Sequence, residues 1–192
     1  MINVSRITMK IWMLLAVFAY PLTVGADVPD GWHLAGSTPQ DYEVGVISTA
    51  KTKSAAYLKS SVDQPGGFGT LMQTFSAVDS RGKRLRLSGA IKASAVENWS
   101  GLWMRIDGAD KKTLGFDNMQ DRPISGSTEW TRYNVVLDVP EQSEAIAFGV
   151  LLVGVGEVHI DDLRFEEVGK DTELTSSKKS LPPKPSNLTF EN

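Results

Sequence analysis

The sequence predicts an all-β protein built as a β-sandwich, and three observations support this fold class. Short segments alternate apolar and polar residues between turn-forming residues, as half-buried strands do. Residues 145–153 form a near-continuous apolar run, which is typical of a central strand covered on both faces. No segment keeps a helical apolar period over the length of a helix. Many short strands of this kind pack as sheets around one core.

The expected strands follow one another along the chain, separated by turn sequences rich in Gly, Pro, Asp and Ser. They cover residues 57–60, 69–75, 84–93, 102–107, 130–139, 145–153 and 157–166. A long polar loop is expected between the fourth and fifth of these strands. The alternation within the strands predicts that Leu87, Ile106, Val135 and Phe148 face the core.

Residues 1–26 have the pattern of a cleaved signal peptide. Arg6 and Lys10 supply a basic start, residues 11–20 are apolar, and small residues permit cleavage after Ala26. A membrane anchor is the alternative, but the apolar run is shorter than the roughly 20 residues that span a bilayer. We therefore expect a periplasmic or secreted protein that does not span the membrane after cleavage.

The composition limits the partners of the chain. Its 192 residues include 20 Lys and Arg against 23 Asp and Glu, a net charge of −3 that becomes about −5 without residues 1–26. An acidic chain of this kind argues against nucleic acid as a partner, because binding phosphates needs a clustered positive field. The chain has no cysteine, so a hydrophobic core in residues 27–168 must stabilise the fold without disulfides.

Six motifs, taken in their order along the chain, resemble those of a known family. They are LMQTFSA (71–77), RGKRLRLSGAIKA (81–93), GLWMRIDG (101–108), FDNMQDRPI (116–124), the pair Trp130 and Tyr133, and EVHIDDLRFEEV (157–168). Together they resemble the galactose-binding-like jelly rolls, in the style of carbohydrate-binding modules of bacterial envelope proteins. Such modules also occur beside carboxy-terminal-processing peptidases and helix-turn-helix regulators. The resemblance spans about residues 31–168 and implies a single jelly-roll domain.

The C-terminal residues divide into two parts. Residues 169–186 have the composition of a flexible linker, rich in Lys, Ser, Thr and Pro. In residues 187–192, Leu188 and Phe190 alternate with polar residues. Modules of the resembling type often begin with an Asn-x-x-Phe-Glu strand, which is missing near the N-terminus here. We therefore expect residues 187–192 to dock back as that strand; a disordered tail and the start of a second module are the alternatives.

Trp103, Arg105 and Asp107 form the first candidate site, because alternation places them on one face of one strand, with Gln73 expected on a neighbour. An aromatic ring flanked by charged groups suits a sugar, whose apolar face stacks on the ring while its hydroxyls accept and donate hydrogen bonds. The alternative is a buried Trp103, with an Arg–Asp pair that holds the long loop.

The loop that follows offers a second group of polar side chains, Asp117, Asn118 and Arg122. A loop at the rim of a sandwich can bind a ligand through such groups. It can equally satisfy its own backbone through Asx turns, with Arg122 bonded to Asp107 or Asp117.

Metal binding and catalysis have weaker signals. The resemblance implies a structural calcium at Asp161, which would need further oxygen ligands such as Asp41 or Glu43; a solvated acid pair is the alternative, and no other cofactor is expected. No nucleophile motif or phosphate-binding loop is present, and the histidines stand outside metal-binding spacings.

The sequence therefore favours an exported, non-catalytic binding module for a glycan or small polar ligand. The alternatives are a protein-interaction domain that docks an envelope protein and a small enzyme resembling a glycosidase.

Overall fold

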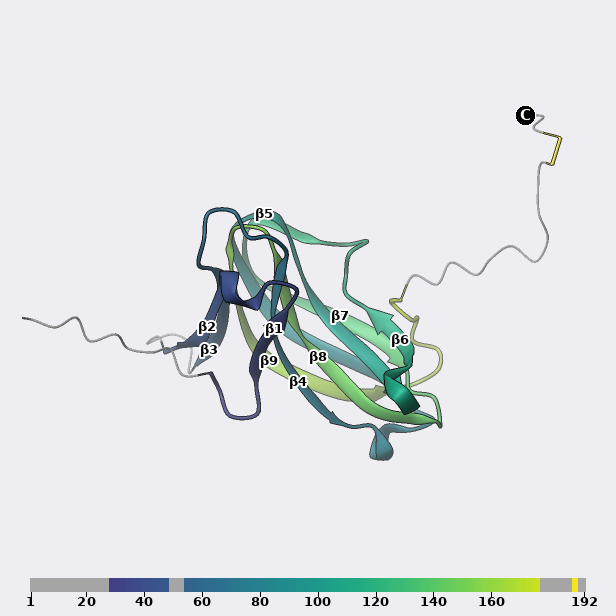
Figure 1. Ribbon diagram of the computed structural model, residues 1–192. Coiled ribbons are helices and arrows are strands. Elements are labelled where there is room, and N and C mark those ends of the chain that lie inside the picture. Colours follow the sequence, from purple (N-terminus) through teal and green to yellow (C-terminus); the bar gives the residue numbers. More distant parts are fainter. Residues whose placement is uncertain (1–27, 49–53, 177–187, 190–192) are drawn as a thin grey trace, which may run out of the picture.

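The computed structural model describes residues 28–48, 54–176 and 188–189, and within these residues the protein is almost entirely β-sheet (Figure 1). The helical elements described are three 3₁₀ turns, η1 (Pro39–Asp41), η2 (Val78–Ser80) and η3 (Ala109–Lys111). None of the helices in this part of the chain has the length and apolar character needed to cross a bilayer. The predicted signal peptide, residues 1–26, lies outside the described residues.

The described strands all pair in antiparallel fashion. They are β1 (His33–Gly36), β2 (Tyr42–Ile47), β3 (Ala55–Ser60), β4 (Phe68–Ser76), β5 (Arg84–Gly108), β6 (Thr113–Asp117), β7 (Ile124–Asp138), β8 (Ser143–Val153) and β9 (Glu157–Val168). Their hydrogen-bonded order is β1-β4-β8-β5-β9-β3-β2, and β6 and β7 also pair with β5.

Strand β5 belongs to both layers of the sandwich. Its first half pairs with β7 and β9, and its second half pairs with β8 and β6. We call β1, β4, β8, residues 99–108 and β6 layer 1, and β2, β3, β9, residues 84–96 and β7 layer 2. The pairing of β5 with β7 shifts register between Ala93 and Ser100, and Ala95 has a φ of 50°. Bulges of this kind bend a strand, and here they carry β5 from one layer into the other.

The core between the layers confirms the predicted alternation. Leu87, Ile106 and Val135 are fully buried, and Phe148 is 5 % exposed. All four belong to one continuous hydrophobic cluster that both layers share. The jelly-roll β-sandwich predicted from the sequence is therefore the fold of the chain.

Several elements differ from the sequence prediction. The structure adds the short strands β1, β2 and β6, and it joins the predicted strands 84–93 and 102–107 into β5. Strand β6 and the first part of β7 occupy much of the predicted long loop, which leaves residues 118–123 between them. The first half of β7 is mostly exposed, so its sequence carries little apolar alternation.

The first eight residues of the predicted linker are held against the sandwich. We call residues 169–176 the C-terminal segment. The Thr175 N–H donates to the Val136 carbonyl oxygen (3.1 Å), and the Val136 N–H donates to Thr175 Oγ1 (2.7 Å). Arg84 Nη1 also donates to the Lys170 carbonyl oxygen (2.8 Å). This segment is therefore part of the folded domain; residues 177–186 of the predicted linker lie outside the described residues.

The predicted terminal strand is only partly described. Leu188 and Thr189 form a turn, and Leu188 is 72 % exposed, so these two residues do not pack as a strand on the sandwich. The other residues of this segment lie outside the described part of the chain, where docking stays a prediction.

Candidate ligand-binding site

The outward face of layer 1 carries the largest group of the predicted site residues. Leu102 and Met104 are buried in the main core, so alternation turns Trp103 to the outer face. The strand registers place Met72 of β4, Gly149 of β8 and Trp103 side by side across the layer.

Trp103 faces outward, but neighbouring side chains cover its ring. It is 5 % exposed and packs with Ala147 and Leu151 in a small hydrophobic cluster separate from the main core. Its Nε1–H donates to Thr70 Oγ1 (2.8 Å), and the Thr70 hydroxyl donates to the Val150 carbonyl oxygen (2.8 Å). Trp103 therefore forms the fixed floor of this face.

Above this floor lies a cavity of about 470 Å³, which we call the tryptophan hollow. Its lining comprises Ala35, Gly36, Phe68, Thr70, Met72, Trp99, Trp103, Arg105, Phe116, Asn118, Leu151 and Val153. Phe68 is 37 % exposed and Phe116 is 47 % exposed, and Trp99 is half-buried. A cavity of this size, with aromatic walls and a few polar groups, is typical of small-ligand sites.

Gly101 allows the rim of the hollow to form. A Cβ at this position would lie 2.5 Å from the backbone oxygen of Asn118, closer than such atoms approach. The absence of a side chain lets the loop after β6 close down on β5, and this contact brings Asn118 to the hollow.

Arg105 and Asp107 form the predicted pair. Arg105 Nε donates to Asp107 Oδ1 (2.8 Å), and its Nη2 donates to Oδ2 (2.9 Å). Asp107 is 11 % exposed in its side chain and Arg105 is 42 % exposed, so the carboxylate holds the guanidinium at the edge of the hollow. Arg105 lines the hollow, whereas Asp107 does not.

The loop at residues 118–123 is organised around an ion pair between half-buried Arg122 and the buried carboxylate of Asp117. Arg122 donates from Nη2 to Asp117 Oδ2 (2.7 Å) and from Nη1 to Oδ1 (3.1 Å). Asp117 Oδ1 also accepts from the Met119 N–H (2.9 Å), and Asn118 Oδ1 accepts from the Gln120 N–H (3.1 Å). Burial would lower the pKa of Arg122, but its hydrogen bonds with Asp117 leave that pKa raised. The Asx-turn interpretation describes this loop, with Asp117 rather than Asp107 as the partner of Arg122.

The structure does not bring Gln73 into the hollow. Thr70 and Met72 of the same strand line the hollow, so Gln73 turns to the opposite face. Its amide lies against Gly31, where an added Cβ would meet Gln73 Nε2 at 2.7 Å.

The candidate calcium ligands also lie apart. Asp161 Oδ1 accepts from the Asp162 N–H (2.6 Å), while Glu43 pairs with a lysine on β3 and Asp41 accepts a backbone hydrogen bond from the loop before β4. No cluster of three His, Asp or Glu that could hold a metal exists among residues 28–48, 54–176 and 188–189. Asp162, the other acid of the pair, instead bonds Arg132 and Arg164.

The prediction missed Trp99, Phe68 and Phe116. Trp99 lies four residues before Trp103 in β5, an even spacing that places both on the same face of a strand. This signal was available in the sequence. Phe68 and Phe116 reach the hollow through strand pairing, and no local pattern indicates that.

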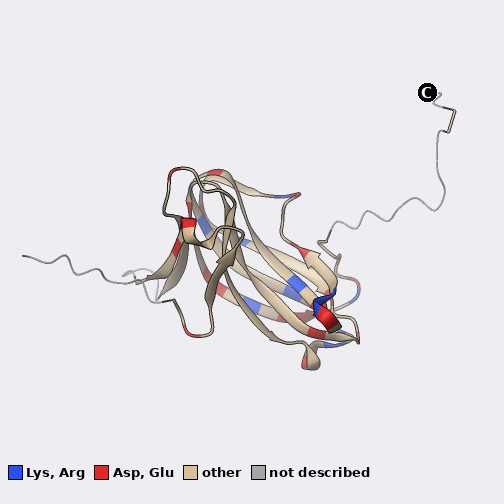
Figure 2. Ribbon diagram, in the orientation of Figure 1, with Lys and Arg blue, Asp and Glu red and all other residues tan. Residues whose placement is uncertain are grey.

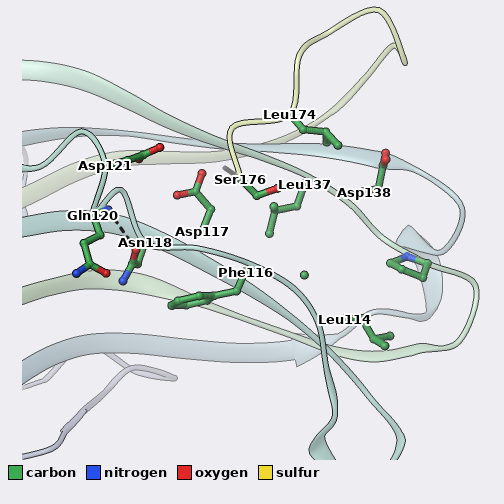
Figure 3. Close-up of a pocket in the computed structure, with 12 residues that line it drawn as sticks. Leu114, Phe116, Asp117, Asn118, Gln120, Asp121, Leu137, Asp138, Leu174 and Ser176 are labelled. Atoms are coloured by element: carbon green, nitrogen blue, oxygen red, sulfur yellow. Dashed lines mark hydrogen bonds between the residues drawn. The ribbon is translucent and has the colours of Figure 1, made fainter. Parts of the chain in front are cut away.

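A second cavity adjoins the hollow, and we call it the rim pocket (Figure 3). It measures about 600 Å³ and is lined by Leu114, Gly115, Phe116, Asp117, Asn118, Gln120, Asp121, Leu137, Asp138, Pro140, Leu174 and Ser176. Figure 3 shows Phe116, Asn118 and Gln120 on one side of it, and Leu174 and Ser176 of the C-terminal segment on another. Phe116 and Asn118 line both cavities.

Solved structures with the same architecture include binding modules and enzymes. The CBM22-1 xylan-binding domain of Paenibacillus barcinonensis Xyn10C aligns with a TM-score of 0.52 and 12 % identity, over 75 % of this chain and 90 % of that one. The Stig cyclase Fisc of Fischerella sp. TAU aligns at 0.53 and 16 % identity, over 74 % and 87 %. The enzymatically active domain of bacteriophage CBA120 tailspike protein 4 aligns at 0.57 and 13 % identity, over 75 % and 21 %. The protein therefore has the jelly-roll fold found in carbohydrate-binding modules, and identities this low show the fold alone.

No known protein-family model matches the chain. It is 46 % identical over 168 residues to the uncharacterized HTH-type transcriptional regulator YbfP of Bacillus subtilis strain 168. The match covers 84 % of this chain and 56 % of YbfP, so the chain spans only about half the length of this relative.

Proposed function

We propose that the protein is a non-catalytic module that binds a glycan in the tryptophan hollow. The observation that carries this proposal is the lining of the hollow, where the rings of Trp99, Phe68 and Phe116 stand beside the polar groups of Arg105 and Asn118. Aromatic rings stack on the apolar faces of sugars, and guanidinium and amide groups bind sugar hydroxyls. Arg105 Nη1 makes no hydrogen bond within the described residues, so it is available to a ligand.

The chemistry of the lining supports a binding role over a catalytic one. Hydrolysis of a glycoside ordinarily requires two carboxyl groups on either side of the scissile bond. The described residues that line the hollow include neither a carboxylate nor a histidine. The xylan-binding module with the same fold supports a glycan as the ligand class. Because residues 1–26 are predicted to be a cleaved signal peptide, we propose that the protein binds its glycan in the periplasm or outside the cell. We also propose that the mature domain does not cross the membrane.

A glycan array followed by isothermal titration calorimetry tests the proposal, with xylohexaose as the first soluble probe. We expect Trp99→Ala and Phe116→Ala to weaken binding about tenfold or more, because each removes a stacking surface. Trp130→Ala is the matched control, since Trp130 is 37 % exposed on layer 2, beside His159. Its binding should equal that of the parent protein.

Two results would contradict the proposal. One is the absence of binding to every glycan on the array; recovery of an envelope protein by pull-down would then favour the protein-interaction alternative. The other is undiminished binding by both hollow variants. Release of reducing sugar from a bound glycan would instead support the alternative that resembles a glycosidase.

A further inference from the structure

The tryptophan hollow and the rim pocket meet at the end of β6. Phe116 lies on β6 opposite Arg105 of β5, is 47 % exposed, and lines both the tryptophan hollow and the rim pocket. Asn118 likewise borders both cavities. At about 470 and 600 Å³, each cavity falls in the range of small-ligand sites.

We propose that the rim pocket is a second subsite for the same glycan, so that the ligand is an oligosaccharide chain crossing Phe116 from one cavity to the other. This inference rests on the proposed function of the hollow. A chain of sugars can place one unit on each side of the exposed ring, and the apolar surfaces of Leu114 and Leu174 in the rim pocket offer further contacts.

The wall of the rim pocket is fixed before any ligand arrives. Leu174 and Ser176 belong to the C-terminal segment, which Thr175 bonds to the backbone of β7. Arg122 Nη1 donates to the Thr175 carbonyl oxygen (3.4 Å) while the same guanidinium holds Asp117. The guanidinium of Arg122 thus bonds both the loop after β6 and the C-terminal segment. A wall set in place in this way lowers the ordering cost of binding.

The charged side chains of the rim pocket indicate which kind of sugar unit can bind there. Its lining contains three carboxylates, Asp117, Asp121 and Asp138, and none of the described Lys, Arg or His residues. The cations that pair with these carboxylates, Arg122, Arg84 and Lys170, lie outside the lining. Carboxylate oxygens accept hydrogen bonds from hydroxyl or ammonium groups, and the described lining offers no cation that could bind the carboxylate of an acidic sugar. The unit in the rim pocket is therefore a neutral sugar or an amino sugar, and not a uronic acid.

Calorimetry with matched di- and hexasaccharides tests the inference. The probes are β-1,4-linked xylose, glucose and glucosamine, with α-1,4-linked galacturonate as the acidic series. We expect a neutral or amino hexasaccharide to bind about tenfold or more tightly than its disaccharide, and hexagalacturonate to bind weakest. Leu174→Ala should lower affinity for the hexasaccharide and leave that for the disaccharide unchanged. Phe68→Ala, at the hollow alone, should lower both.

The outcomes separate this inference from the proposed function. Equal affinity for both lengths, with no effect of Leu174→Ala, overturns the second subsite and leaves the hollow as a binding site. Tightest binding of hexagalacturonate overturns the assignment of the sugar class. If no member of any series binds and the glycan array is also empty, the proposed function itself fails.

Discussion

The outward faces of the two layers are built from different kinds of residue. On layer 1, β4 and β8 contain one charged residue between them, Glu144, and their ribbons are almost uncharged in Figure 2. On layer 2, ion pairs cross the outer face. Arg86 pairs with Glu166 and Lys92 with Glu129 on neighbouring strands, and Arg132 of β7 reaches across β5 to Asp162 of β9.

This difference indicates what each face is suited to do. Exposed ion pairs are well solvated, contribute little to stability and keep a sheet face soluble. An apolar face with aromatic side chains remains partly exposed to water until something covers it. The same sandwich thus has one face covered by solvated ion pairs and one largely apolar face, and the following predictions test that contrast from the largest expected effect to the smallest.

Trp103→Ala should give the largest loss of stability on layer 1. The ring is 5 % exposed and packs against Ala147 and Leu151, so its removal leaves a cavity beneath the hollow. We expect the free energy of unfolding to fall by about 3–5 kcal/mol, as for other buried aromatics. Urea denaturation measures this change. A loss below about 1 kcal/mol would mean that Trp103 is not the structural floor of layer 1.

Arg122→Ala should have the next largest effect, because it leaves the Asp117 carboxylate without its guanidinium while that carboxylate is 4 % exposed. We expect a loss of about 2 kcal/mol, the usual cost of an unsatisfied charged hydrogen-bonding group. The double variant Arg122→Ala/Asp117→Asn should recover part of the loss in a double-mutant cycle. Additive losses would show that the two side chains are not coupled.

Asp138→Asn should give a smaller effect that depends on pH. Hydrogen bonding to Arg84 lowers the pKa of Asp138 from 3.8 to about 2, against the opposing effect of burial and with help from Lys170. A carboxyl group whose pKa is lower in the folded state stabilises the protein at every pH above its unfolded-state pKa. This stabilisation disappears as the pH falls from about 4 to about 2.

The side chain of Asp138 is 40 % exposed, so solvent screening limits the contribution to about 1 kcal/mol or less. Thermal melts of both proteins across this pH range should differ above pH 4 and converge near pH 2. A difference that grows on acidification would contradict the ion-pair assignment.

Lys92→Ala should have the smallest effect and completes the contrast between the faces. Its partner Glu129 is 89 % exposed, and the two atoms are 3.6 Å apart. We expect a change within about 0.5 kcal/mol, which added salt should reduce further. A loss comparable to that of Trp103→Ala would remove the distinction between the two faces.

The sequence predicted what depends on local alternation. Leu87, Ile106 and Val135 are buried as expected, because an inward position repeats every second residue within a strand. Trp103 and Arg105 meet at the hollow for the same reason. The pairing of distant strands carries no such local signal.

The errors follow from that limit. Gln73 was placed beside Trp103, but only the register of β4 against β8 decides which side chains of β4 share its face. Phe116 lies in β6, a short strand that forms by pairing with β5. The C-terminal segment docks through one backbone hydrogen bond and through bonds between backbone groups and the side chains of Arg84 and Thr175. Such contacts leave no apolar pattern in a polar sequence.

The passage of β5 through both layers has a consequence for how the molecule opens. Among the described strands, β5 is the only hydrogen-bonded link between the group β1, β4, β8 and the group β9, β3, β2. Neither sheet can detach from β5 without exposing the core that both cover. We therefore expect native-state hydrogen exchange to give the same opening free energy for the slowest-exchanging amides of both sheets. That result would mean that the two sheets unfold together as one cooperative unit.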